Sequence, residues 1–185
     1  MLQSDIIKFT PNLPEDKIAA IKDVTVWGGC KAFIEFSESF YPTATAFGSE
    51  PETAGHRLYY DAAYGQNTSK HILGLFAVGQ IADPYLEREG EEKIEYILNE
   101  LDELFDGNAS DKYVNHIFQN WTEKPYINGA YIHYFEDWKN IRTLGQPIAD
   151  KVFFAGDGYT DGSDWSSVHA AAEAAINVVQ KLVAN

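Results

Sequence analysis

The carboxyl-terminal segment constrains the fold of this chain most. Residues 151–155 form an apolar run that predicts a β-strand, and this run leads directly into Gly156-Asp157-Gly158. After a short polar loop, an alanine-rich helix is expected to start near Trp165 or Ser166. A strand that ends at a glycine and an acid before a helix is the element with which α/β folds hold a cofactor, because the start of a helix presents free N–H groups.

Dinucleotide-binding folds normally place this element at their start, where it carries a Gly-x-Gly-x-x-Gly motif. Here the element lies at the end of the chain, and the motif occurs nowhere in the 185 residues. We therefore expect the chain to correspond to the later part of a cofactor-binding fold.

The charge of the chain excludes several classes of partner. The 28 acidic and 14 basic residues give a formal net charge of -14. Nucleic acids and anionic membrane surfaces both require basic patches, so we expect neither as a partner. The longest acidic stretch, Glu87–Asp106, also carries regularly spaced apolar residues, which indicates the solvated face of a helix.

The sequence contains a single cysteine, Cys30, so no intrachain disulfide can form and a reducing compartment is expected. Residues 1–8 lack the basic start and apolar core of a signal peptide, and no apolar run reaches the length of a membrane span. These features predict a cytoplasmic protein that does not enter a membrane. None of the five histidines has the spacing of a metal site, so no metal ligand is assigned.

Hydrophobic periodicity predicts an α/β protein. The clearest helix is expected over Glu91–Phe105, because its apolar residues recur at three- and four-residue spacing before Gly107 ends it. A shorter helix is expected over Glu15–Lys22. β-branched and aromatic residues predict four strands, over Val24–Phe36, Leu58–Tyr64, His71–Val78 and Tyr113–Trp121.

Glycines and polar residues mark the breaks between these elements. Gly28-Gly29 predicts a β-bulge in the first strand, and Gly65–Lys70 predicts a hairpin loop between the second and the third. The composition changes at Leu144–Pro147, which places the one expected domain boundary between residues 145 and 146.

Three separated parts of the sequence form a recognisable pattern. They are, in chain order, Leu2–Pro14 with Lys31–Phe36 and Phe40–Pro42, then Trp121 with Gly129–Tyr131, and then Phe153–Asp157 with Val168–Ala171. In this order and at these distances they resemble the flavin-dependent amine oxidase family, and the plant-type polyamine oxidases most closely.

The resemblance implies a fold and a cofactor. Residues 1–145 would form a substrate domain, a mixed sheet with flanking helices, and residues 146–185 would supply the last strand and helix of an FAD-binding domain. Members of the family oxidise an amine by passing a hydride to FAD, and the electrons then go to oxygen or another acceptor. The family's amino-terminal dinucleotide fold is missing here, so we expect an incomplete chain that binds FAD weakly or not at all alone.

An incomplete chain leaves apolar surface uncovered. Self-association is the simplest cover, so we predict a homodimer or larger assembly; an amino-terminal FAD-domain partner supplied as a separate chain is the other expected cover. An alternative to an amine oxidoreductase is a non-catalytic binding or scaffold module derived from the same family. Another flavoprotein branch, such as a desaturase or a protoporphyrinogen-type oxidase, is disfavoured by Lys31 together with Trp121 and Tyr131.

The resemblance also implies roles for two residues near the reacting atoms. Lys31 matches the family lysine that holds a water against flavin N5, and on a strand it would share a partly desolvated face with Phe33 and Glu35. The alternative is a lysine on the solvated face of a half-exposed strand. Tyr131 matches one of the two aromatic residues that line the amine, where ring faces attract a cation. The family's second aromatic residue often stands at the position of Ser167.

The implied cofactor contacts lie at the end of the chain. Gly156 and Asp157 match residues beside the ribityl and pyrophosphate groups, although the family usually has glutamate where Asp157 stands. Family geometry directs the backbone N–H of Val168 to the flavin pyrimidine carbonyl, with Ser167 beside it. Two alternatives remain: the acid caps the turn after a strand, and the helix packs on a sheet through its alanines.

Overall fold

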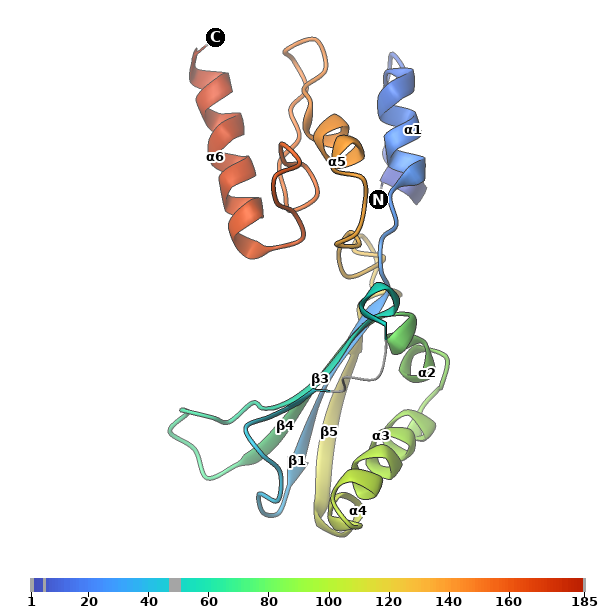
Figure 1. Cartoon of the computed structure of the whole chain (residues 1–185), viewed down its shortest axis with the longest axis vertical. Coiled ribbons are helices and arrows are strands. Elements are labelled where there is room, and N and C mark those ends of the chain that lie inside the picture. Colours follow the sequence, from blue (N-terminus) through green and yellow to red (C-terminus); the bar gives the residue numbers. More distant parts are fainter. Residues whose placement is uncertain (1, 5, 47–50, 185) are drawn as a thin grey trace. The chain divides into compact units, whose positions relative to one another are not determined.

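The computed structural model describes residues 2–4, 6–46 and 51–184 (Figure 1). Packing divides the chain into two compact units. We call Trp27–Ala130 the sheet unit, and we call Met1–Val26 together with Tyr131–Asn185 the helical unit.

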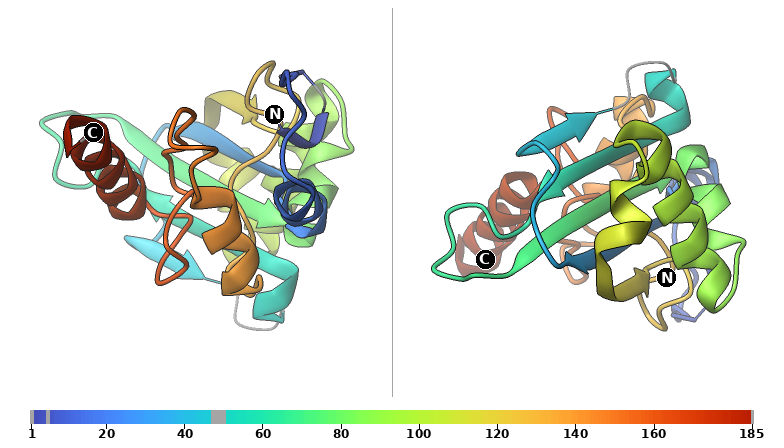
Figure 2. Two further views of the ribbon diagram at one scale, coloured as in Figure 1. Left: turned by 90° about the horizontal axis from the view of Figure 1, so that it is seen from above. Right: turned by 90° about the horizontal axis from the view of Figure 1, so that it is seen from below.

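The sheet unit is built on a five-stranded sheet whose strands lie side by side in the order β2-β3-β4-β1-β5 (Figure 2). The strands are β1 (Gly29–Phe36), β2 (Ala44–Ala46), β3 (Gly55–Asp61), β4 (His71–Gly79) and β5 (Tyr113–Asn120). Every neighbouring pair runs antiparallel. The helical turns and helices of this unit are η2 (Glu52–Ala54), η3 (Gln80–Ala82), α2 (Asp83–Leu86), α3 (Glu91–Leu104) and α4 (Asn108–Lys112).

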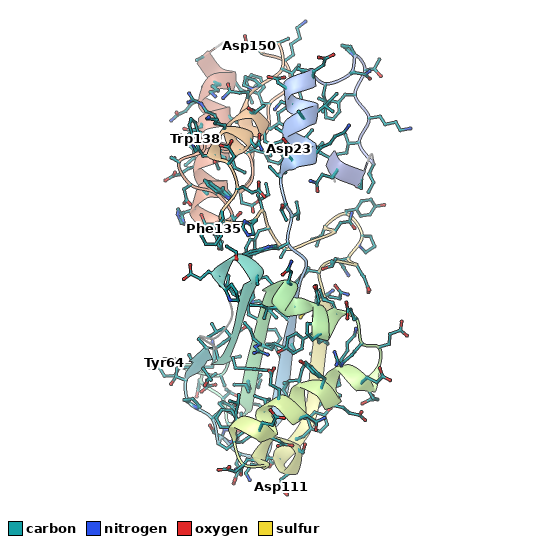
Figure 3. All side chains as sticks on the ribbon, turned by 45° about the vertical axis from the view of Figure 1, so that its right-hand side comes forward. Asp23, Tyr64, Asp111, Phe135, Trp138 and Asp150 are labelled. Atoms are coloured by element: carbon teal, nitrogen blue, oxygen red, sulfur yellow. The ribbon has the colours of Figure 1, made fainter. Side chains whose placement is uncertain are left out.

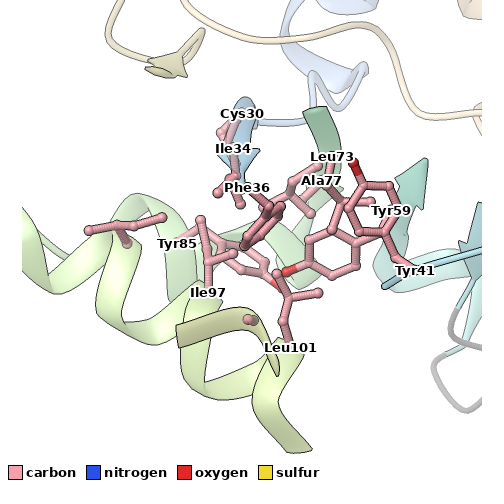
Figure 4. Packing of buried hydrophobic residues seen from close by; sticks show 14 of the residues in the cluster. Cys30, Ile34, Phe36, Tyr41, Tyr59, Leu73, Ala77, Tyr85, Ile97 and Leu101 are labelled. Atoms are coloured by element: carbon pink, nitrogen blue, oxygen red, sulfur yellow. The ribbon is translucent and has the colours of Figure 1, made fainter. Parts of the chain in front are cut away.

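One face of the sheet is covered by helices, and the main core lies between the sheet and these helices (Figure 4). Alternate residues of β1 from Cys30 to Phe36 are at most 2% exposed, and Ile97 and Leu101 of α3 are buried in the same cluster. Lys31, Phe33 and Glu35 lie on the opposite, more open face of β1. This alternation is what an antiparallel sheet with one covered face requires.

A buried polar network joins the helices to the sheet. The Glu100 carboxylate on α3 accepts hydrogen bonds from the hydroxyl groups of Tyr59 (2.6 Å) and Tyr85 (2.9 Å), and it forms an ion pair with Arg57. Burial, together with the neighbouring Glu100 charge, raises the pKa of the Tyr85 hydroxyl. Buried polar groups are tolerated when they are paired in this way.

The helical unit contains η1 (Leu2–Ser4), α1 (Glu15–Asp23), α5 (Trp138–Gly145) and α6 (Val168–Ala184). Its core consists of Ala20, Ile21, Val24, Ile141 and Leu144.

Lys17 on α1 is buried beside the end of α5. Its Nζ donates hydrogen bonds to the carbonyl groups of Thr143 (2.9 Å) and Leu144 (2.7 Å), and it lies 4.1 Å from the centre of the Phe154 ring. The last carbonyl groups of a helix have no donors within the helix. Lys17 therefore supplies hydrogen bonds to two carbonyl groups that would otherwise lack a donor beside an apolar core.

The predicted mixed α/β class with flanking helices is confirmed, and the sheet unit follows the sequence pattern closely. The helices expected over Glu15–Lys22 and Glu91–Phe105 match α1 and α3, and the hairpin expected around Gly65–Lys70 joins β3 to β4. The strand predicted over Leu58–Tyr64 lies three residues earlier, at Gly55–Asp61. The sequence did not predict α5, which occupies an aromatic-rich region that had no clear periodicity.

Two predictions at the start of the first strand are wrong. Regular pairing begins at Gly29 rather than at Val24, and before it Val26 makes only an isolated bridge to Ile132. The register shift in β1 lies between Glu35 and Phe36 rather than at the two glycines. Gly29 instead donates its N–H to Thr122 Oγ1 at 3.0 Å, and a side chain there would collide with Val78.

The strand predicted over residues 151–155 is also wrong. Its backbone bonds are local: the Ile148 N–H donates to the Val152 carbonyl (2.9 Å), and the Val152 N–H donates to the Ile148 carbonyl (3.2 Å). No strand pairs along this run within residues 2–4, 6–46 and 51–184. Apolar composition alone does not make a strand, because each strand needs a neighbour to satisfy its backbone.

The last helix begins at Val168, not at Trp165 or Ser166. Ser166 has a φ of 61°, a left-handed conformation that cannot continue into a right-handed helix. The boundary expected between residues 145 and 146 lies inside the helical unit, and the assignment of residues 146–185 to an FAD-binding domain stays a prediction.

Candidate functional site

Lys31 lies on the open face of the sheet, on β1. It pairs with Phe76 of β4 on one side and with Gln119 of β5 on the other. Its ammonium lies 5.5 Å from the centre of the Phe76 ring and 5.7 Å from the centre of the Tyr60 ring. The lysine is half-buried between aromatic rings, so its surroundings are not those of a fully solvated face.

Tyr131 lies in the helical unit, at the start of an extended segment. The segment is held beside the end of α1 by the bridge between Ile132 and Val26 and by the His133 N–H, which donates to the Thr25 carbonyl at 2.9 Å. The ring centres of Tyr131 and Tyr134 lie 5.3 Å apart. Burial and the neighbouring Tyr134 raise the pKa of the Tyr131 hydroxyl, which is therefore protonated at neutral pH.

Further aromatic side chains follow Tyr131 along the chain. Phe135 and Trp138 are both exposed (Figure 3), and the Phe135 ring lies 5.3 Å from the ring of His133. This part of the helical unit therefore offers several ring faces to solvent, which suits a cationic or flat ligand.

The loop before α6 is tied to the Tyr131 segment. The Ser166 hydroxyl donates to the Ile132 carbonyl at 2.5 Å, and the Trp165 ring N–H donates to the His133 carbonyl at 3.0 Å. Ser166 is buried despite being polar, and its left-handed backbone is held by these contacts. The start of α6 and the residue next to Tyr131 are thus fixed to each other.

Ser167 caps α6. Its hydroxyl accepts the Ala170 N–H at 3.2 Å and its carbonyl accepts the Ala171 N–H at 3.1 Å, which is the geometry of an N-cap residue. The N–H groups of Val168 and His169 come before the first helical acceptor, so the helix itself does not use them. The Val168 side chain is 89% exposed, and this end of the helix is open.

A carboxylate lies close to the same helix end. Asp164 Oδ2 is 2.6 Å from His169 Nε2 and 3.3 Å from Ser167 Oγ, and Ser167 Oγ is 3.3 Å from the same Nε2. A catalytic serine–histidine–aspartate triad uses the two ring nitrogens for different partners. Because one nitrogen meets both partners here, this exposed cluster caps the helix and is not a nucleophilic site.

Gly156 and Asp157 form the turn that leads to this loop. Gly156 has a φ of 148°, which favours glycine, and the Asp157 carbonyl accepts the Ser166 N–H at 3.0 Å. Gly158 packs against Ile132, since a Cβ at Gly158 would lie 2.6 Å from the Ile132 Cδ1. Burial and the Asp157 charge raise the pKa of Tyr159.

The structure therefore brings most of the predicted site residues together around Ile132. The turn with Gly156 and Asp157, the capped end of α6 with Ser167 and Val168, and the segment that starts at Tyr131 all adjoin it within the helical unit. Lys31 belongs to the sheet unit. Sequence reasoning missed Ile132 and Ser166, which connect these pieces. A pair of serines before an alanine-rich helix was a readable N-cap signal.

Within the described ranges, no group of three or more histidine, cysteine, aspartate or glutamate side chains could hold a metal ion. No helix formed by those residues is both long and apolar enough to cross a membrane.

Comparisons with known proteins identify the family of the chain. The sequence profile of the family described as flavin containing amine oxidoreductase matches residues 2–183. The chain is 26% identical over 163 residues to Lysine-specific histone demethylase 1 homolog 3 of Arabidopsis thaliana, covering 84% of this chain and 10% of that protein. It is 25% identical over 195 residues to Polyamine oxidase 3 of Oryza sativa subsp. japonica, covering 98% of this chain and 38% of that protein.

Solved structures show the same fold. The A394C mutant of putrescine oxidase, from a structure-based redesign of cofactor binding, superposes with a TM-score of 0.78 at 16% identity. The match covers all of this chain and 41% of that one. The chain thus spans well under half the length of the relatives it matches.

Proposed function

Because the chain belongs to the flavin-containing amine oxidoreductase family, we propose that it supplies the substrate sheet and the terminal helix of an FAD-dependent amine oxidoreductase. FAD, the cofactor that the family implies, accepts a hydride from the amine when it is bound. The observation that carries the proposal is the cluster around Ile132, in which the turn, the capped helix end and the Tyr131 segment are fixed to one another.

The residues at the start of α6 fit an electron-rich cofactor. The N–H groups of Val168 and His169 are not used by the helix, and the helix dipole is positive at this end. A flavin gains negative charge when it is reduced, so this end would stabilise the reduced form. Gly156 allows a close backbone approach in the adjoining turn, where Asp157 would face the ribityl and pyrophosphate groups.

The aromatic residues fit the substrate. A protonated amine is attracted to ring faces, and Tyr131 with Tyr134 offers two rings whose centres lie 5.3 Å apart. The Tyr131 hydroxyl remains neutral at the pH at which an amine is protonated, so it orients the amine without an opposite charge. Lys31, half-buried on the open sheet face, would hold a water and supply a positive charge beside the reacting atoms.

We further propose that a partner completes the chain. Polyamine oxidase 3 and the putrescine oxidase structure both continue beyond the part that this chain matches. Most of the larger apolar residues of α6 are more than half exposed, and an apolar surface of this kind needs a cover. The proposed cover is an amino-terminal FAD-binding half; a homodimer is the alternative, and a scattering mass of the purified chain separates the two.

The test is reconstitution with a matched pair of variants. The chain is mixed with FAD and with the separately expressed amino-terminal half of a polyamine oxidase, and amine-dependent bleaching of the flavin is recorded. Val168→Pro removes one proposed flavin donor and leaves the helix intact, because proline is favoured at the first helical position. Val168→Ala keeps the donor. We expect bleaching with wild type and Val168→Ala, and a clear loss of flavin binding with Val168→Pro.

Lys31→Met provides a second test, and the control is Lys124→Met, at an exposed lysine of the same unit. Lys31→Met is expected to slow amine oxidation without unfolding the protein, and Lys124→Met is expected to change neither. If the mixture never binds FAD while the chain stays compact and stable, the oxidoreductase proposal is overturned, and a non-catalytic binding or scaffold module becomes the better description.

A further inference from the structure

The open face of the sheet places two aromatic rings around a single lysine. Phe76 stands directly opposite Lys31 in the β1–β4 pair, and Tyr60 of β3 stands opposite Gly74, two residues before Phe76. The Lys31 ammonium lies 5.5 Å from the centre of the Phe76 ring and 5.7 Å from that of Tyr60. Both distances are within the reach of about 6 Å over which a ring face attracts a cation.

Gly74 explains why the Tyr60 ring lies where it does. A Cβ at Gly74 would lie 2.5 Å from Tyr60 Cζ and 2.8 Å from each Cε atom, far inside van der Waals contact. The ring therefore lies over the bare backbone of β4, in space that any side chain at Gly74 would occupy. Phe33, the other cross-strand neighbour of Gly74, lies two residues beyond Lys31 on the same face.

The nearest acid on this face does not hold the lysine. Glu35 forms an ion pair with Lys70, which comes from the loop before β4. The surroundings of the Lys31 ammonium are thus dominated by ring faces. A lysine side chain has four flexible bonds, and two rings that flank its end restrict it far more than solvent does.

We propose that Tyr60 and Phe76 are positioning residues for Lys31, and that Gly74 is there to admit the Tyr60 ring. The rings hold the ammonium at one place over the open sheet face, so that it is already ordered when a ligand arrives. The role of the ammonium in catalysis rests on the proposed function. The positioning of Lys31 by the two rings does not, because all of these residues belong to the sheet unit.

The test measures the reactivity of Lys31 in the chain alone. The purified chain is pulsed with an amine-acylating reagent, and the rate at each lysine is read by mass spectrometry. Tyr60→Leu and Phe76→Leu are each expected to raise the rate at Lys31 by about two- to fivefold, the factor that a cation–π contact at a partly exposed site corresponds to. Tyr60→Phe keeps the ring and is expected to match wild type.

Lys112, a part-buried lysine in the same unit, reports on the fold. Its rate must stay constant in each variant, which separates loss of a ring from loss of the sheet. Gly74→Ala is expected to displace the Tyr60 ring and to raise the Lys31 rate as Tyr60→Leu does. The proposal is overturned if the Leu variants leave the Lys31 rate unchanged, or if Tyr60→Phe behaves like Tyr60→Leu.

The reconstituted mixture separates this inference from the proposed function. If both hold, Tyr60→Leu slows amine oxidation, and adding it to Lys31→Met has no further effect. If the Lys31 rate responds as expected while no preparation ever bleaches the flavin, the positioning stands and the proposed function fails. If Tyr60→Leu slows oxidation equally in the presence and absence of the Lys31 side chain, Tyr60 does not act through Lys31 and the inference fails.

Discussion

The two compact units bury their apolar side chains to very different extents. In the sheet unit, α3 lies over the sheet, and Ile97 and Leu101 are at most 1% exposed. In the helical unit, the buried residues of α6 are the small Ala170 and Ala174. Among the larger apolar residues of that helix Val178 is partly buried, but the others are more than half exposed: Val168, Ile176, Val179, Leu182 and Val183.

This difference separates the main buried core, in the sheet unit, from the proposed cofactor contacts, in the helical unit. The sheet unit encloses its own core and supplies a rigid support for Lys31. The helical unit holds the predicted cofactor contacts in loops and at a helix end, and it leaves an apolar stripe open. We therefore expect changes in the core of the sheet unit to alter folding most, and changes at the start of α6 and its adjoining loops to alter binding.

The largest expected effect compares one leucine from each unit. Leu101→Ala in α3 is expected to lower the free energy of unfolding by about 2–5 kcal/mol, because it leaves a cavity in a closed core. Leu182→Ala in α6 is expected to change it by less than about 0.5 kcal/mol, since that side chain is already exposed. Urea unfolding measures both. Similar losses in the two variants would show that α6 is covered in solution.

The polar network offers a smaller test within the sheet unit. Glu100→Gln keeps the shape of the side chain but removes the charge that faces Arg57 and the two tyrosine hydroxyls. We expect a loss of about 2 kcal/mol, because the part-buried Arg57 guanidinium is left without its counter-charge. The matched control is Glu103→Gln, an exposed position on the same helix. An equal response of the two variants contradicts the assigned role.

Lys17 gives the helical unit a pH dependence of its own. Burial lowers the pKa of the Lys17 ammonium from 10.5 to about 8. The folded chain releases this proton at a lower pH than the unfolded chain, so between these values the unfolded state binds more protons. The contribution of Lys17 to stability therefore rises with pH across this window, by at most about 1.4 kcal/mol per pH unit.

The measurement is urea unfolding of wild type and Lys17→Met at pH 7.5, 8.5 and 9.5. The stability of wild type is expected to increase relative to the variant as the pH rises, because the variant has lost the titrating group. Neutral lysine retains two N–H donors for the carbonyl groups of Thr143 and Leu144, so the contacts survive deprotonation. If the stabilities of wild type and Lys17→Met changed in parallel with pH, Lys17 would have the same pKa in the folded and the unfolded chain, and the prediction would be wrong.

The same contrast explains which parts of the molecule could be predicted from the sequence. In α3, Ile94, Ile97 and Leu101 recur on one face, and the structure buries all three. Such periodicity indicates a helix that packs one apolar face against other parts of the same chain. Residues 151–155 are as apolar as a strand, yet they lack a pairing partner among the described residues, and composition cannot supply one.

The candidate site was harder to predict because backbone contacts assemble it. The carbonyl groups of Ile132 and His133 receive the side chains of Ser166 and Trp165, and any residue type could have provided those carbonyls. The left-handed conformation of Ser166 could not be predicted, because serine rarely adopts it. The resemblance indicated Tyr131, Ser167 and Val168 individually, but their place beside Ile132 follows from the folding of the chain.

The smallest expected effect concerns the acid at the open end of α6. Asp164 lies 2.6 Å from His169 and places a negative charge where the proposed flavin edge would bind. Asp164→Asn is expected to strengthen FAD binding in the reconstituted mixture by about two- to fivefold, the factor that one charge near a helix start corresponds to. Asp161→Asn, in the same exposed loop, is the control and should leave the FAD affinity unchanged. Fluorescence titration of FAD measures each affinity. A weaker affinity in Asp164→Asn would mean that the carboxylate organises the helix end for the cofactor instead of competing with it.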